Sequence, residues 1–342
     1  MDKSLIRNLY TKISKDYDLL GANLTSVLKN ILKENSLDFL SVNYRVKDIN
    51  SFLQKIDRKK YKDPFEEIED ICGLRIICYY ESDIEKVVSV LSKELNILTI
   101  ENKEELLDYN QFGYRSYHYI IKINKDWAKV PDYRNLENFK CELQIRTISM
   151  HAWAEISHKL SYKKKEHIPK QFLKSLSMIA AKLTDVDDHL NTLRTDVNEY
   201  KKEFSQKLKD ESPTFDNDIN VDNLRVFIEY LFPYTDLMET SENRMIEIVD
   251  FLQHFKLDFG EILKYYKNQK NNVQKINQAF QYEVEDDADH YSRYYSSHPF
   301  SGDDLFLILI YLGNANIWEE RKDNFNHQSL KLMIENTIAN NG

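Results

Sequence analysis

The chain has 342 residues, more than one typical domain of roughly 100–200 residues, so it has room for two domains. Hydrophobic residues make up 42% and charged residues 30%, which is ordinary globular usage, and the scarcity of Gly (7) and Pro (6) argues against long flexible linkers. The longest apolar run, Leu305–Leu312, falls far short of the roughly 20 residues that cross a bilayer, which excludes a membrane span. Residues 1–17 lack the apolar core of a secretory signal, so we expect a cytoplasmic protein with no membrane contact.

The first 160 residues alternate predicted helices and strands. Apolar residues recur at helical spacing through residues 1–62, which predicts helices there. β-Branched and aromatic runs, or alternating polarity, predict strands at 74–80, 96–100, 118–123 and 140–145. We expect one helix that is capped by Ser82 or Asp83 and ends near residue 95, and another over 147–160.

Three cysteines lie in the apolar, strand-like segments of this region. Cys72, Cys78 and Cys141 form no CxxC pair. A thiol in such a segment usually serves as a small hydrophobic side chain, so we expect all three to be buried and reduced.

Beyond Pro169 the pattern becomes one long helix. Its apolar residues run from Phe172 to Phe204 in steps that alternate between four and three. Such a seam packs against another helix, either within the same chain or in another subunit. Further helices are predicted over Asn223–Phe232, Glu242–Phe255 and Asp303–Leu312.

The charge balance changes along the chain. Residues 1–211 carry 36 Lys and Arg against 34 Asp and Glu, whereas residues 212–342 carry 11 against 22. The change predicts two domains, 1–211 and 212–342, the second acidic, helical and regulatory or oligomerising. A nearly neutral first domain can still hold a local phosphate site, whereas the acidic second domain would repel a polyanion.

Residues 44–56, with the sequence YRVKDINSFLQKI, gather cations near a predicted helix start. Ser51 and Lys55 lie four apart and share one helix face, and Arg45 and Lys47 precede the helix. Arg binds phosphate oxygens bidentately and Lys adds a compact charge, so the group suits a polyphosphate. A solvated charged helix face is the competing explanation.

The second polar group is in residues 65–80, where Asp70 precedes an apolar strand that contains Arg75. A buried Arg needs a partner or an anion, and the Asp supplies oxygen ligands for magnesium. A structural Asp70–Arg75 pair remains the alternative.

Two further polar groups follow in the chain. In residues 113–120, Tyr114 can stack on a base and His118 can contact phosphate or ribose. Glu142, Gln144 and Arg146 alternate along a strand and so project from one face. The carboxylate of Glu142 can complete a metal site and deprotonate a hydroxyl. A strand with one merely solvent-exposed face would show the same alternation of polar and apolar residues, so that explanation stays open.

Taken together, these segments resemble the synthetase domain of the RelA/SpoT alarmone family over roughly residues 41–165. YRVK with Ser51 and Lys55 is similar to the family's ATP-binding motif, and EDICGLRI to its magnesium-binding strand. GYRSYH is similar to its acceptor-base motif, and ELQIRT with HAWAEISHKLSYK to its catalytic strand and following helix.

The resemblance implies an α+β fold with a nucleotidyltransferase-like mixed sheet, followed here by a mainly helical C-terminal region. It implies transfer of the pyrophosphate of ATP to the 3′-hydroxyl of GDP or GTP with Mg²⁺. For ATP, it implies adenine contact by Arg75 and phosphate binding by Arg45, Lys47, Ser51 and Lys55. It also implies magnesium binding by Asp70 and Glu142, with Glu142 activating the acceptor hydroxyl as well. The acceptor purine would stack on Tyr114, and the acceptor or phosphate would be contacted by His118, Gln144 and Arg146.

The sequence lacks one feature of the family, and other functions within the family remain open. No His is followed directly by Asp, so the metal motif of the family's hydrolase domain is absent from this sequence. Toxic members of the family modify the 3′ end of tRNA, and the basic runs at 59–62 and 163–165 could support RNA, with the acidic region as an inhibitor. An inert regulatory binding protein is a second alternative. Small synthetases of this type often form tetramers, so we also expect a homo-oligomer.

Overall fold

The computed structural model describes residues 3–102, 117–160, 170–210, 215, 219–233, 235, 241–286, 300–324 and 328–341. The chain divides into two compact units, residues 1–194 and 195–342. No helix in the described ranges is both long enough and apolar enough to cross a membrane.

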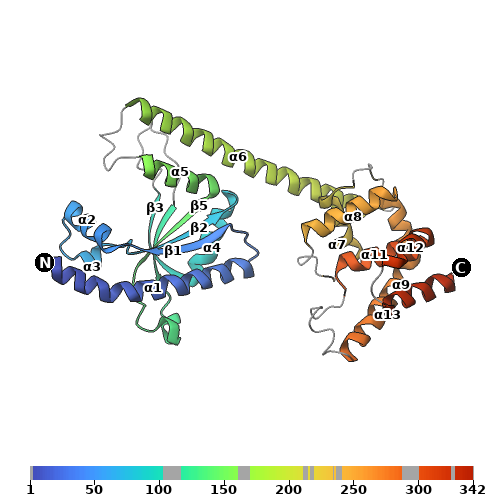
Figure 1. Cartoon of the computed structure of the whole chain (residues 1–342). Coiled ribbons are helices and arrows are strands. Elements are labelled where there is room, and N and C mark those ends of the chain that lie inside the picture. Colours follow the sequence, from blue (N-terminus) through green and yellow to red (C-terminus); the bar gives the residue numbers. More distant parts are fainter. Residues whose placement is uncertain are drawn as a thin grey trace. The chain divides into compact units, whose positions relative to one another are not determined.

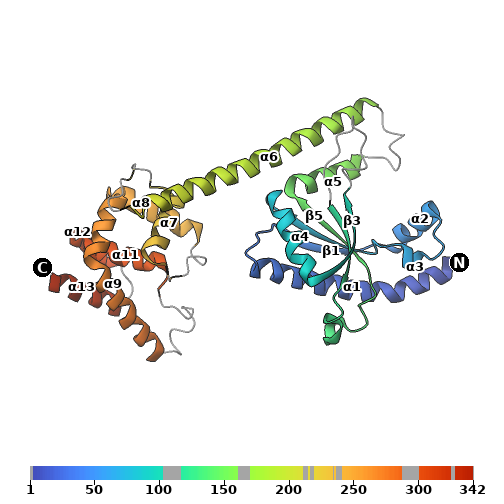
Figure 2. The ribbon, with the colours of Figure 1, turned by 180° about the vertical axis from the view of Figure 1, so that it is seen from behind.

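The first unit is a five-stranded mixed sheet with helices on both faces (Figures 1 and 2). The strands are β1 (Ser41–Val46), β2 (Cys72–Cys78), β3 (Leu95–Asn102), β4 (Tyr117–Ile123) and β5 (Cys141–Thr147), in the order β1-β2-β5-β4-β3. Strands β2 and β5 are parallel and the other neighbours are antiparallel. The helices are α1 (Lys3–Glu34), α2 (Ile49–Lys59), α3 (Pro64–Glu67), α4 (Ser82–Glu94), α5 (Ile148–Leu160) and the start of α6 (Lys170–Lys207). The α+β prediction is thereby confirmed.

One face of the sheet is apolar and is covered by α1 and α4. The buried side chains of α1 recur every three or four residues, which gives this helix one continuous apolar stripe. Gly21 lies in that stripe because α1 crosses β1 closely: a Cβ there would lie 2.2 Å from Cδ2 of Tyr44. The close crossing holds β1, the edge strand that carries Arg45, against α1.

The three cysteines are buried and free, as expected. Cys72 and Cys141 are paired in register on adjacent strands, and their mutual hydrogen bond, together with burial, raises the pKa of Cys141. Burial raises the pKa of Cys78 to about 12. The thiols of Cys78 and Cys141 therefore stay protonated, and all three buried side chains act as small hydrophobic groups.

The second unit is helical and has its own core. Its helices are α7 (Val221–Leu231), α8 (Glu242–His254), α9 (Phe259–Asp286), α11 (Gly302–Gly313), α12 (Ala315–Arg321) and α13 (Gln328–Asn341), joined by the end of α6. Helices α9 and α11 cross tightly at Gly313, where a Cβ would lie 2.3 Å from Cγ of Tyr265. Phe227, Phe306 and Trp318 are almost completely buried in this core.

Three details differ from the sequence predictions. Residues 41–46 form an edge strand, so the prediction of helices alone before residue 62 was wrong. Neither Ser82 nor Asp83 caps α4; its N-cap is Glu81, and Asp83 is buried, 2.6 Å from Arg194 Nη1. The two units divide within α6, whereas the change of composition lies just after that helix ends.

Candidate functional site

The face of the sheet opposite α1 carries polar side chains in register. Directly opposite residues on neighbouring strands lie on the same face. Arg45, Gly73 and Glu142 therefore form one row across β1, β2 and β5. Arg75, Gln144 and His118 form the next row across β2, β5 and β4, and Arg146 follows one step further along β5.

Gly73 has no side chain in the first row. A Cβ at this position would make ordinary van der Waals contact with Arg45, whose Cγ would lie 3.8 Å away, so a Cβ fits without a clash. The bare backbone is flanked by a cation from Arg45 and a carboxylate from Glu142. This is where a substrate can approach the sheet backbone.

Glu142 is held by two neighbours. Its Oε1 lies 2.7 Å from Nδ1 of His118, and its Oε2 accepts a hydrogen bond from Nε2 of Gln144 at 3.0 Å. The side chain of His118 is 6% exposed, whereas that of Glu142 is 17% exposed and remains accessible. The carboxylate is thus oriented by partners on β4 and β5, as a general base requires.

Arg75 is paired with α5. Its Nη1 donates to Oε1 of Glu155 at 2.9 Å and lies 3.4 Å from Nδ1 of His151. Its Nε is buried and has no hydrogen-bond partner among the described residues. The expected alternative of an Asp70–Arg75 pair is not observed, and the guanidinium keeps one donor for a ligand.

Positive charge is concentrated on this face. Burial and the neighbouring guanidinium of Arg75 lower the pKa of Arg146 to about 10, while Glu142 and Glu155 oppose the shift. Arg45 contributes to the same lowering, so three guanidinium groups influence one another. Arg146 remains charged at neutral pH, and an anion would relieve the repulsion.

Two lysines converge on Asp70. Nζ of Lys47 lies 2.9 Å from Oδ2 of Asp70, and Nζ of Lys55 lies 2.9 Å from Oδ1. Asp48 accepts hydrogen bonds from the backbone N–H groups of Asn50 and Ser51 and so starts α2, as the sequence predicts. The hydroxyl of Ser51 contacts the same carboxylate and lowers the pKa of Asp48. The N-cap therefore sets the direction in which α2 presents Lys55.

The carboxylates suit a cation that is shared with a substrate. No group of three or more His, Cys, Asp or Glu with metal-site geometry occurs within the described ranges. Asp70 Oδ1 is buried and accepts no well-aligned hydrogen bond from any residue that the structure describes, although Lys55 lies close. Magnesium typically takes one or two carboxylates and completes its shell with phosphates and water, so the oxygen ligands that Asp70 and Glu142 offer are of the kind that this ion takes.

The predicted site residues are thus placed in two groups. Lys47 and Lys55 surround Asp70. The second group shares the polar face of the sheet and consists of Arg45, Arg75, His118, Glu142, Gln144 and Arg146. Tyr114 and the basic run 163–165 lie outside the described residues. Sequence reasoning missed His151 and Glu155, although their spacing of four on the helix after the polar strand could have indicated them.

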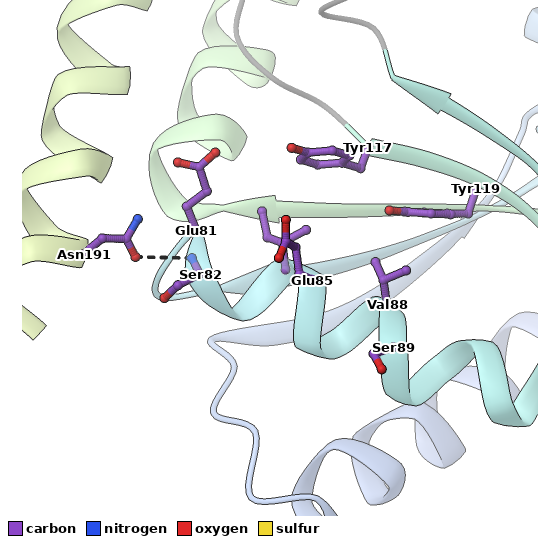
Figure 3. Close-up of a pocket in the computed structure, with 9 residues that line it drawn as sticks. Glu81, Ser82, Glu85, Val88, Ser89, Tyr117, Tyr119 and Asn191 are labelled. Carbon is purple, nitrogen blue, oxygen red and sulfur yellow. Dashed lines mark hydrogen bonds between the residues drawn. The ribbon is translucent and has the colours of Figure 1, made fainter. Parts of the chain in front are cut away.

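A concavity lies on the α4 side of the first unit (Figure 3). Its volume is about 520 Å³, and it is lined by α4, β4 and α6. Oδ1 of Asn191 on α6 accepts a hydrogen bond from the backbone N–H of Ser82 at 3.2 Å. Four residues earlier on α6, Asp187 accepts a hydrogen bond of 2.6 Å from Oγ1 of Thr147, at the end of the polar strand β5. The first part of α6 is therefore anchored to the sheet.

Known proteins resemble this chain over the first unit. Residues 44–167, which include every predicted site residue, match the model for the region found in RelA / SpoT proteins. The GTP pyrophosphokinase YjbM of Bacillus subtilis is 32% identical over 168 residues, which cover 48% of this chain and 76% of YjbM. The GTP pyrophosphokinase YwaC of the same organism is 34% identical over 157 residues, covering 45% and 72%. The structure of small alarmone synthetase 1 from Bacillus subtilis, 28% identical, covers 56% of this chain and 99% of its own, with a TM-score of 0.48.

Proposed function

This chain belongs to the RelA/SpoT family, and we propose that its first unit transfers the pyrophosphate of ATP to the 3′-hydroxyl of GDP or GTP, forming (p)ppGpp and AMP. The observation that carries the proposal is the polar sheet face, where the oriented carboxylate of Glu142 lies in register with Arg45. Relatives named as GTP pyrophosphokinases support the same reaction.

The cations provide the binding site for the ATP phosphates. We assign this role to Arg45, Lys47, Ser51 and Lys55, with Arg75 beside the adenine. In the free protein Asp70 holds Lys47 and Lys55 2.9 Å from its oxygens, which keeps both ammonium groups oriented before a polyphosphate arrives. Orientation of this kind lowers the ordering cost of binding.

Glu142 activates the acceptor. Its carboxylate accepts the proton of the 3′-hydroxyl while the oxygen attacks the β-phosphorus of ATP. The new bond joins the 3′-oxygen to the β-phosphorus, the bond from that phosphorus to the oxygen of the α-phosphate breaks, and AMP leaves with those electrons. Gln144 and His118 hold the carboxylate in place, and Arg146 adds positive charge near the transferred group.

Magnesium is the cofactor that we assign to Asp70 and Glu142, where it would neutralise phosphate charge. Tyr114 would stack on the acceptor purine, next to His118, Gln144 and Arg146.

We further propose a cytoplasmic homo-oligomer that associates through α6. Side chains at seven-residue intervals on this helix are exposed: Phe172, Ile179, Val186, Leu193 and Tyr200. Five large apolar residues in one heptad position would be costly to leave in water, and a second copy of the helix would cover them.

The direct test is an acceptor competition. Purified chain is incubated with ATP and Mg²⁺ together with GDP, GTP and tRNA, and AMP and each labelled product are measured. We expect AMP in equal amount to a guanosine product, with Glu142→Gln lowering the rate about 10²–10⁴-fold at an unchanged melting temperature. Label found on tRNA alone would replace the proposed acceptor, and no AMP with any acceptor would favour an inert binding protein.

A further inference from the structure

A cavity of about 570 Å³ lies in the helical second unit, within the range of small-molecule sites. It is formed by the end of α7, the turn that follows, α9 and α11. No residue that lines it belongs to the first unit. The cavity is therefore distinct from the site proposed for ATP and its acceptor.

The charge of this cavity is opposite to that of its surroundings. Residues 212–342 carry 22 Asp and Glu against 11 Lys and Arg. The lining includes Lys267 and Lys270, one turn apart on α9, and none of the described residues that line the cavity is an Asp or a Glu. Two ammonium groups in a concave site within an acidic region favour an anion there, because the described lining residues add no competing negative charge.

Aromatic rings lie beside the two lysines. The hydroxyl of Tyr266 donates to the carbonyl oxygen of Leu231 at 2.9 Å, and its ring meets that of Phe232 edge-on with centroids 5.9 Å apart. Nζ of Lys270 lies 5.4 Å from the centroid of the Tyr266 ring. Tyr230, 42% exposed, also lines the cavity. A fixed ring with a cation beside it suits a ligand that combines an aromatic group with negative charge.

A hydrogen-bond acceptor lies further along the same helix. Oδ1 of Asn277 is buried and has no hydrogen-bond partner among the described residues. Asn277 is seven residues beyond Lys270, which corresponds to about 10 Å along α9. A buried polar atom without a partner is costly, and an N–H or O–H group of a ligand would satisfy it.

The order along α9 is thus aromatic ring, positive charge and acceptor. From these features we propose that the cavity binds a nucleoside diphosphate ester, a ligand whose diphosphate lies between an aromatic base and a second, hydroxyl-bearing group. The base packs against Tyr266 and Tyr230, the diphosphate meets Lys267 and Lys270, and a hydroxyl donates to Asn277. A free nucleoside diphosphate lacks the last contact.

The test is titration calorimetry on the full chain with UDP-glucose and CDP-glucose, pyrimidine esters that differ from the purine nucleotides assigned to the first unit, each beside its matching nucleoside diphosphate and inorganic pyrophosphate. We expect at least one ester to bind tighter than its diphosphate. Lys267→Gln with Lys270→Gln should raise the Kd of that ester at least tenfold. Lys264→Gln with Lys275→Gln, an equal charge change at exposed positions of α9 outside the lining, should leave it within twofold.

A second variant separates binding from folding. Asn277→Leu removes an unpaired buried oxygen, so it should weaken ester binding at least threefold without lowering the melting temperature. Any of four results overturns the proposal: no ester binds, esters bind no tighter than diphosphates or pyrophosphate, the Lys267 and Lys270 substitutions leave the Kd unchanged, or Asn277→Leu leaves the Kd unchanged.

Discussion

The hydrogen bond between Thr147 and Asp187 ties helix α6 to the end of strand β5, and its energy can be measured. Both residues are almost completely buried, and Oγ1 of Thr147 donates to Oδ2 of Asp187 at 2.6 Å. The same hydroxyl accepts from the backbone N–H of Met150 at 3.1 Å at the start of α5. A hydrogen bond to a charged group contributes about 1.5–3 kcal/mol to stability.

The perturbation is a double-mutant cycle of Asp187→Ala, Thr147→Val and their combination, with Thr147→Ser as the control that keeps the hydroxyl. We expect a coupling free energy of about 1.5–3 kcal/mol for the pair. For a unit of this size, 1 kcal/mol corresponds to roughly 2–4 °C in melting temperature, so Asp187→Ala should lower the first unit's transition by roughly 3–12 °C. Differential scanning calorimetry of the full chain measures the melting temperature of the first unit in each variant.

The cycle also has a catalytic readout, because Thr147 follows Arg146 on β5. A loosened strand end should lower kcat for AMP formation more than it raises KM for ATP. A coupling free energy below about 0.5 kcal/mol would refute the reasoning, since independent sites give values of that size. Loss of stability in Thr147→Ser equal to that in Thr147→Val would also contradict it.

Further predictions concern pH, assembly and ATP binding. Burial and a neighbouring guanidinium lower the pKa of His151 below 6.5, so the unfolded chain binds more protons and the free energy of unfolding falls as the pH drops through that value. Thermal melts between about pH 8 and pH 5 should show a smaller fall for His151→Gln, and an unchanged slope would contradict the assignment. Leu193→Lys should yield monomers in light scattering, because it places a charge in the exposed apolar row of α6. Asn198→Lys, on another face of α6, should leave the oligomer intact. Oligomers that persist in Leu193→Lys would exclude α6 as the site of association. Lys55→Ala should raise KM for ATP about tenfold or more, whereas Arg58→Ala, exposed on the same helix, should leave it unchanged, and equal effects would indicate only bulk electrostatics.

The fold of the first unit was largely predictable because its strands are marked by composition. Strands β2 and β5 are apolar on the buried face, and the alternation of Glu142, Gln144 and Arg146 gave their common face directly. Strand β1 could not be found in this way. It is an edge strand of six residues in which only Val42 is buried, so burial imposes almost no apolar pattern on its sequence.

The site was predictable in residue type but not in pairing. Asp70 and Arg75 are close in sequence, yet they do not pair with each other. Asp70 forms ion pairs with Lys47 and Lys55. Arg75 pairs with Glu155, 80 residues away in the sequence. Such partners depend on how α2 and α5 pack on the sheet, and periodicity along one segment does not record that packing.

All three cysteines lie in the first unit and are buried there, and the second unit has none. A thiol-reactive dye added to the native chain should therefore react only when the sheet opens. The rate of colour development then measures the rate at which the first unit unfolds. A single cysteine engineered on the surface would be labelled against an almost silent background, so spectroscopic probes can be attached to either unit without removing a native residue.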